Sequence, residues 1–134
     1  MAISSTGLID GTLLIGALRT FNSNNAGTLT TVNGSVYNAG TITTSTARMT
    51  FANGSNYYHT RNGGGIPTAL WSDGSTCNVT GVSNTSLTNI SADPGFYNFV
   101  WDCASQSALI RLTTSSVTIT SRGRFEVRNT NNQI

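Results

Sequence analysis

The chain has 134 residues, which suits a single domain, and only 9% of them are charged, giving a net charge of +2 at pH 7. Such weak charge excludes the basic surface of a nucleic-acid-binding protein, and no apolar run reaches the roughly 18 residues that a membrane span needs. Lysine is absent, whereas Thr, Ser, Asn and Gly are abundant. With β-branched and aromatic residues spread along the chain, this composition favours an all-β, turn-rich domain.

The first segment, residues 1–24, is predicted as a strand or cap that precedes the main module. Its stretch from Leu8 to Leu18 is apolar and interrupted by glycines. Such a stretch either caps its own domain or adds as a strand to another copy of the chain, and both interpretations stay open. Residues 1–18 lack the basic start of a signal peptide, so the targeting signal of an exported protein would have been cut away or would lie elsewhere in a longer parent.

Two internal repeats organise residues 25–128, the predicted module. The heptapeptide at residues 25–31 recurs at residues 38–44 with a single replacement, Ile for Leu. Turn-forming Asn-Gly or Asp-Gly pairs, and a weaker Asp-Pro-Gly, begin at residues 33, 53, 73 and 93, a spacing of 20 each time. Turns at one spacing, with β-branched residues between them, favour a solenoid over a hairpin meander. The sequence therefore predicts a parallel β-helix with about 20 residues per coil.

A coil of this length predicts where the glycine turns and the two heptapeptides lie in the solenoid. Gly34, Gly54 and Gly74 are expected to form a column, because each turn would lie above its predecessor. The two heptapeptides begin at Asn25 and Asn38, which are closer together than one coil. We therefore expect them to form similar strands in different walls of the solenoid.

Alternation of apolar and polar residues indicates which side chains fill the core. Residues 117–128 alternate with a period of two, which predicts a strand with one buried face. Residues 62–67, with three consecutive glycines, are predicted as a loop, and residues 129–134 as a frayed tail. The expected core residues are Val36, Met49, Phe51, Val79, Phe99, Trp101, Ile110, Leu112, Ile119, Phe125 and Val127.

The stretch from Asn62 to Cys103 resembles repetitive cell-surface proteins of Bacteroidetes, of the kind exported with a type 9 secretion sorting domain. The motifs that carry the resemblance are residues 62–71, 75–82 and 97–103, supported by residues 38–42 and 51–55. The similarity covers roughly residues 25–128. It implies a β-helix-like solenoid at the cell surface or outside the cell, with a structural or adhesive role and no catalytic residues.

Cys77 and Cys103 lie in two of these motifs. An even number of cysteines in a surface protein favours a disulfide. Their separation in the sequence matches one coil plus a loop insertion near residues 84–94. Two buried, reduced cysteines are the alternative, and the sequence leaves the choice open. Two cysteines and one histidine do not make a zinc site, so we expect no metal and no cofactor.

Catalytic residues are not expected. His59 is the only histidine, so no other imidazole base is available for a nucleophile, and the five carboxylates form no evident acid pair. Aromatic side chains offer a different chemistry, because they can either stack on sugar rings or fill a narrow β core. The aromatic residues considered as a sugar platform are Tyr57, Tyr58, Trp71 and Trp101.

These observations favour a non-enzymatic structural or adhesive module of an exported bacterial surface protein. One alternative is a carbohydrate-binding module that recognises a surface glycan. Another is a self-assembling subunit of an extracellular filament or of a phage or virion fibre. A solenoid has open ends with unpaired backbone groups, so we expect a homo-oligomer formed end to end or by strand exchange. Neither nucleic acid nor membrane insertion is expected.

Overall fold

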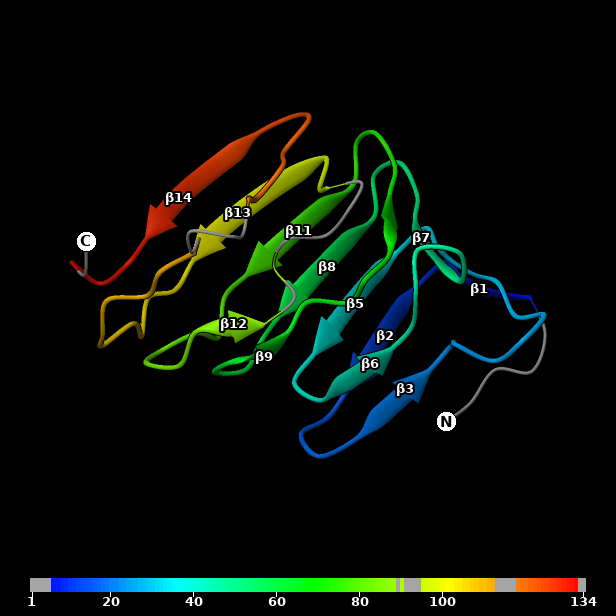
Figure 1. Ribbon diagram of the computed structural model, residues 1–134, viewed down its shortest axis with the longest axis horizontal. Helices are drawn as coiled ribbons and strands as arrows, with labels where there is room; N and C mark the ends of the chain where they lie inside the picture. The colour runs from blue at the N-terminus through cyan, green and yellow to red at the C-terminus, as the bar shows by residue number, and fades with distance from the viewer. Residues whose placement is uncertain (1–5, 89, 91–94, 113–117, 133–134) are drawn as a thin grey trace.

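The computed structural model describes residues 6–88, 90, 95–112 and 118–132, and these residues form strands and turns without a helix. The chain winds into a β-solenoid of about five turns, with roughly 22 residues in each turn (Figure 1). Every described strand pair is parallel. The predicted fold class, an all-β parallel solenoid, is therefore confirmed.

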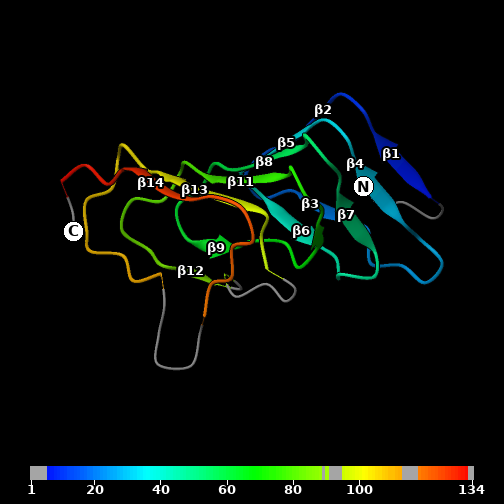
Figure 2. The same cartoon turned by 90° about the horizontal axis from the view of Figure 1, so that it is seen from above.

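Three walls enclose the core, and Figure 2 shows the strands of the largest wall following one another along the molecule. That wall contains, in spatial order, β14 (Phe125–Asn129), β13 (Asn98–Asp102), β11 (Thr76–Val79), β8 (Asn56–His59), β5 (Ser35–Asn38) and β2 (Thr12–Ile15). The second wall contains β1 (Gly7–Ile9), β4 (Thr30–Val32), β7 (Met49–Phe51) and β10 (Leu70–Trp71). The third wall is divided into two pairs, β3 (Thr20–Asn22) with β6 (Thr41–Thr43), and β9 (Gly64–Gly65) with β12 (Leu87–Thr88).

The described part of the N-terminal segment belongs to the solenoid. Its strands β1, β2 and β3 pair with β4, β5 and β6 and form the first turn. The end of the first heptapeptide enters β4 and the middle of the second forms β6, so they lie in different walls as predicted. They do not form similar strands, because residues 28–29, the equivalents of residues 41–42 in β6, are not in a strand. Residues 62–67, predicted as a loop, contain the short strand β9. At the other end, β14 extends to Asn129, the first residue of the predicted tail.

The coils are less regular than the predicted constant spacing. Along the largest wall, one ladder of overlying positions consists of Thr12, Ser35, Asn56, Thr76 and Asn98. The longest coil of this wall runs from Phe99 to Phe125. Gly54 lies on Gly74, with its N–H donating to the Gly74 carbonyl at 3.3 Å. Gly34 lies outside this column, because the register pairs Ser35 with Asn56 and so shifts it by one position. Part of the fourth turn signal, at residues 93–94, lies outside the described residues.

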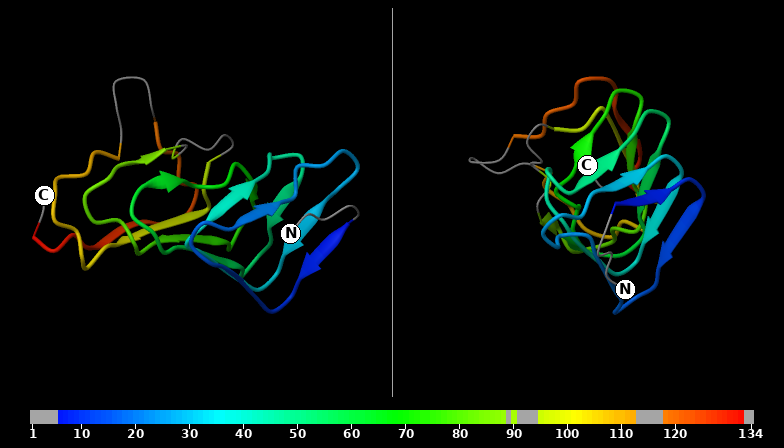
Figure 3. Two further views of the ribbon diagram at one scale, coloured as in Figure 1. Left: turned by 90° about the horizontal axis from the view of Figure 1, so that it is seen from below. Right: turned by 90° about the vertical axis from the view of Figure 1, so that its right-hand side faces the viewer.

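Inward-facing side chains from the walls fill the core, and the coils overlie one another when viewed down the long axis (Figure 3, right). Aromatic rings form much of it: Phe51 stacks on Trp71 with 4.2 Å between ring centroids. Among the predicted core residues, Ile110, Leu112 and Ile119 are only partly buried. Those confirmed as buried are Val36, Met49, Phe51, Val79, Phe99 and Trp101.

Phe125 and Val127 were predicted to be buried, and this is wrong: they are 47% and 53% exposed. Both point inward, because their register partners are the buried Phe99 and Trp101. They belong to the last described strand, however, so no further coil covers them. Of the strand predicted over residues 117–128, only residues from Phe125 onward form β14, and Ser121 makes an isolated bridge to Phe96. Residue 117 lies outside the description.

Candidate functional site

The predicted aromatic platform does not form. Tyr57, Trp71 and Trp101 are buried in the core, so their ring faces are closed to a sugar. The cause is strand parity: Tyr57 and Trp101 occupy inward positions of the largest wall, whereas Tyr58 points outward. Tyr58 is half-buried because it stacks on Tyr37, with ring centroids 4.4 Å apart and an interplanar angle of 4°. Of the four residues considered, only Tyr58 points outward. Its stacking partner, Tyr37, was not among them.

Cys77 and Cys103 are free, buried thiols, so the disulfide considered from the sequence is absent. The register explains this, because the ladder partner of Cys77 is Phe99, not Cys103. The extended chain between Phe99 and Cys103 places Cys103 about 13 Å further along the wall, whereas a disulfide needs Cα atoms within about 7 Å. Burial raises the pKa of Cys77 well above its ordinary value and that of Cys103 to about 11. Both thiols therefore act as core residues.

A chain of buried hydrogen bonds runs through the middle of the solenoid. The Asn38 side-chain amide donates to the Tyr57 hydroxyl at 2.9 Å, and that hydroxyl lies 3.2 Å from His59 Nδ1. His59 Nε2 lies 2.7 Å from the carbonyl oxygen of Gly63. A carbonyl only accepts, so Nε2 carries the proton and Nδ1 accepts from the tyrosine. The network is satisfied only when His59 is neutral.

This network predicts a specific loss of stability in mild acid. Burial lowers the pKa of His59, the Gly63 carbonyl partly opposes the shift, and the Arg61 charge adds to it. The unfolded chain therefore binds the His59 proton at a higher pH than the folded chain. Stability is complete above the ordinary histidine pKa of about 6.5 and falls below it, at up to about 1.4 kcal/mol per pH unit. Urea denaturation at pH 7.0, 6.0 and 5.5 measures this slope.

The matched variant for that measurement is His59→Gln, which removes the only histidine. Its stability at neutral pH is lower, because the bonds to Tyr57 and Gly63 are altered. Its slope between pH 7.0 and 5.5 is nevertheless expected to be close to zero. Equal slopes in the two proteins would show that His59 does not titrate differently in the folded state.

The two ends of the solenoid are open over the described residues. At one end, β2 pairs with β5 on one side and has no described strand on the other. At the opposite end, β14 pairs only with β13. Each end also has a shallow apolar cavity. One, of about 250 Å³, is lined by residues 13–16 and 19–21; the other, of about 220 Å³, includes Trp101, Leu109 and Val127.

Hydrogen-bond parity identifies the backbone groups that each edge presents. The N–H groups of Ser35 and Ala39 donate to the carbonyls of Gly11 and Ile15 at 2.9 and 2.8 Å. The odd-numbered residues of β2 therefore face β5, and the N–H of Leu14 faces away from it. The side chain of Leu14 is 72% exposed. This strand lies within the stretch from Leu8 to Leu18, which the sequence predicts as a cap or as a strand that adds to another copy. Periodicity does not decide between the two, because a strand at a coil end reads like one inside the stack.

At the opposite edge the N–H of Phe99 donates to the carbonyl of Arg124 at 2.8 Å. Arg124 and Glu126 therefore face β13, and the N–H of Val127 faces outward. Beyond Val127 the register shifts, and the carbonyl of Asn129 accepts from the N–H of Cys103 at 2.9 Å. The outer face of β14 carries an ion-paired cluster, in which Glu126 lies 3.0 Å from Arg124 and 2.9 Å from Arg128. These charges cover the outer surface and leave the backbone edge itself open.

Within the described residues, no group of three His, Cys, Asp or Glu side chains is arranged to hold a metal ion. The same residues contain no helix long and apolar enough to cross a membrane. Comparison with protein-family models, with curated proteins and with solved structures found no match to this chain.

Proposed function

We propose that this chain is a non-enzymatic structural or adhesive module of an exported bacterial surface protein, whose ends are completed by further β-coil. The observation that supports the proposal is the pair of outer edges, on β2 and β14, at opposite ends of one core, beside which the described residues place no further strand. Unpaired N–H and C=O groups on such edges are templates for another strand. The resemblance to repetitive Bacteroidetes proteins supports a location at the cell surface or outside the cell.

The two edges complement each other. A β2 strand placed beside β14 in parallel would continue the same inward ladders, bringing Leu13 toward Phe125 and Ile15 toward Val127. The exposed halves of Phe125 and Val127 would be covered, which is favourable in proportion to the apolar area removed from water. The outward residues of β2, Thr12 and Leu14, are uncharged, so they do not repel the ion-paired outer face of β14.

A self-assembling filament or fibre subunit is supported by the same edges, with a second copy taking the place of the next module. Such a contact is heterologous, head to tail, and therefore open-ended. The carbohydrate-binding alternative is weaker in its original form, because three of its four platform residues are buried.

Proline substitution at the two edges tests the proposal. The unaltered chain is expected to associate head to tail as its concentration rises, as measured by light scattering after size-exclusion chromatography. Leu14→Pro and Val127→Pro each remove one outward N–H without breaking a bond to the neighbouring strand. Each variant alone is expected to be monomeric, because every copy has the same blocked end. An equimolar mixture is expected to form a dimer and nothing larger.

Leu14→Thr is the matched control, because it removes the apolar side chain but keeps the N–H group. It is expected to associate nearly as well as the unaltered chain. A chain that stays monomeric up to millimolar concentration would contradict axial stacking. Association that Leu14→Thr abolishes as completely as Leu14→Pro would indicate non-specific apolar contact in place of strand addition.

A further inference from the structure

The third wall is interrupted between β6 and β9, and a polar pocket occupies the interruption. The β3–β6 and β9–β12 pairs belong to separate sheets, so the facing edges of β6 and β9 are not paired with each other. The pocket has a volume of about 350 Å³, near the lower end of the range for small-molecule sites. Its lining consists of residues 41–44 and 65–68 with Arg61 and Thr88.

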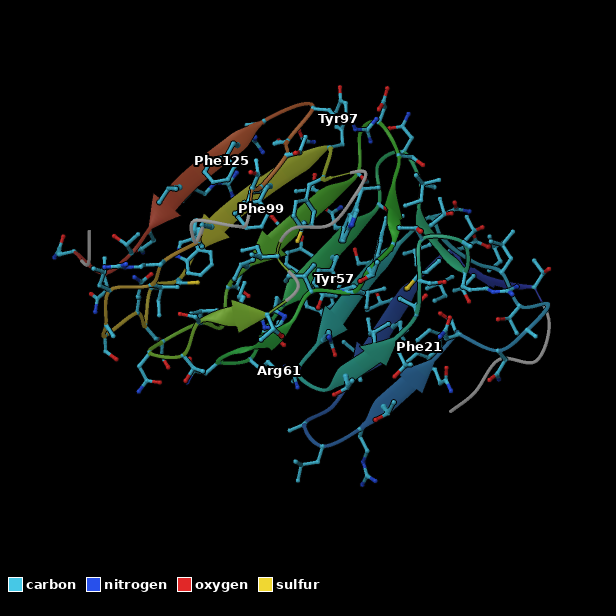
Figure 4. All side chains as sticks on the ribbon, in the orientation of Figure 1. Phe21, Tyr57, Arg61, Tyr97, Phe99 and Phe125 are labelled. Carbon is cyan, nitrogen blue, oxygen red and sulfur yellow. The ribbon has the colours of Figure 1, made fainter. Side chains whose placement is uncertain are left out.

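Arg61 supplies the only charged side chain of this lining, and Figure 4 shows it beside β9. Its Nε atom is buried and has no hydrogen-bond partner among the described residues. The guanidinium lies against Gly64, where a side chain would collide with it. A buried donor without an acceptor is unfavourable by about 1–3 kcal/mol, and more for a charged group. Because this atom is closed to solvent, an acceptor supplied by a ligand would remove this penalty only after the Arg61 side chain turned toward the pocket.

The loop that carries Arg61 is fixed on both sides. Before it, His59 Nε2 donates to the carbonyl of Gly63 at 2.7 Å. After it, the Asn62 side-chain oxygen accepts from the backbone N–H groups of residues 83, 84 and 85 at 2.9–3.0 Å. The Asn62 amide also donates to Asn84 Oδ1 at 2.7 Å. Because these bonds already hold the loop, ligand binding would need little ordering of the backbone that carries Arg61.

We infer that this pocket binds a sugar that carries a carboxylate, of the uronic-acid class. The planar guanidinium fork of Arg61 matches a carboxylate, and no carboxylate of the protein lines the pocket. Threonines at residues 41, 43, 44, 68 and 88 and the strand edges offer partners for sugar hydroxyl groups. Ile42, Ile66 and Pro67 provide the apolar part of the lining. The site lies on a different wall from the β2 and β14 edges, so it does not depend on the stacking proposed above.

Titration of the chain with galacturonic or glucuronic acid, followed by amide NMR shifts, tests this inference. We expect saturable binding, with shifts concentrated at Thr43, Gly65 and Thr88. Glucose, which has no carboxylate, and acetate, which has no sugar ring, are expected to bind at least tenfold more weakly. Thermal unfolding supplies a second readout, because a ligand that binds only the folded chain raises its midpoint.

Arg61→Gln is expected to lose the binding and the thermal shift while keeping the unliganded midpoint, since it removes an unsatisfied donor. Arg61→Lys keeps the charge but not the fork, and is expected to bind at least tenfold more weakly than the unaltered chain. Arg111→Gln, at an exposed arginine outside the pocket, is the matched control and is expected to bind normally. Undiminished binding by Arg61→Gln, or no saturation by either uronic acid, would overturn the inference. If acetate or sulfate bound as tightly as the uronic acids, the pocket would hold an adventitious ion only, and the inference would be overturned.

Discussion

Replacing Trp71 with alanine is expected to lower the free energy of unfolding by about 3–5 kcal/mol, the range for deleting a buried large aromatic side chain. Trp71 is fully buried and stacks on Phe51 at 4.2 Å between ring centroids. It also makes an edge contact with Tyr57 at 5.9 Å and a tilted contact with Phe96 at 5.2 Å. Phe51 and Tyr57 belong to the preceding coil and Phe96 to the following one, so truncation would leave a cavity between coils in the middle of the stack.

Phe125→Ala is the matched comparison, because Phe125 also points inward and stacks on Phe99 at 5.3 Å. Its ring is at the open end, so its removal creates no enclosed cavity, and the expected loss is about 1 kcal/mol. Urea denaturation of both variants at pH 7 measures the difference. Because Trp71 Nε1 has no hydrogen-bond partner among the described residues, the larger loss would report packing alone. Equal losses would contradict the assignment of Trp71 to the centre of the core.

The repeats predicted the solenoid because they record its physical periodicity. Turns near Asn33, Asn53 and Asp73 recur because each coil must bend at the same corner, and alternation in the strands reports which side faces the core. The unequal lengths of the coils, which set the register along the largest wall, were less predictable. Extra residues in a corner do not change the alternation within the strands, so the sequence pattern does not reveal them. One such extra residue shifts Gly34 by one position and moves it out of the predicted column.

The candidate sites were harder to predict than the fold. Alternation correctly placed Phe125 and Val127 on the inward face. It could not show that β14 is the last described strand of its wall, which leaves both side chains exposed. The disulfide failed for a related reason: sequence separation located Cys77 and Cys103 on neighbouring coils without giving the register along the wall. Arg61 gave no sequence signal, because its pocket exists only where β6 and β9 fail to pair. That interruption depends on how coils of unequal length stack.

Replacing Gly34 with alanine is expected to destabilise the protein by about 3 kcal/mol, at the upper end of the range for overpacking. A Cβ at this position would overlap the backbone carbonyl of Gly11 in the preceding coil and approach the Asp10 carbonyl carbon to 2.8 Å. Backbone atoms cannot rotate away as a flexible side chain can, so the first coil would have to move. The backbone angle is not the cause: Gly54 and Gly74 have φ near +80°, whereas Gly34 lies outside the left-handed region.

Gly11→Ala is the matched control, since Gly11 is the neighbour of Gly34 in the same stack. It also lies outside the left-handed region, and a Cβ there would meet nothing within 4 Å. Alanine at Gly11 is therefore expected to leave stability unchanged or raise it by up to about 1 kcal/mol, because the unfolded chain loses conformational freedom. Thermal and urea unfolding of both variants measure the contrast. Similar effects of the two substitutions would contradict the close approach of Gly34 to the backbone of Asp10 and Gly11 in the preceding coil.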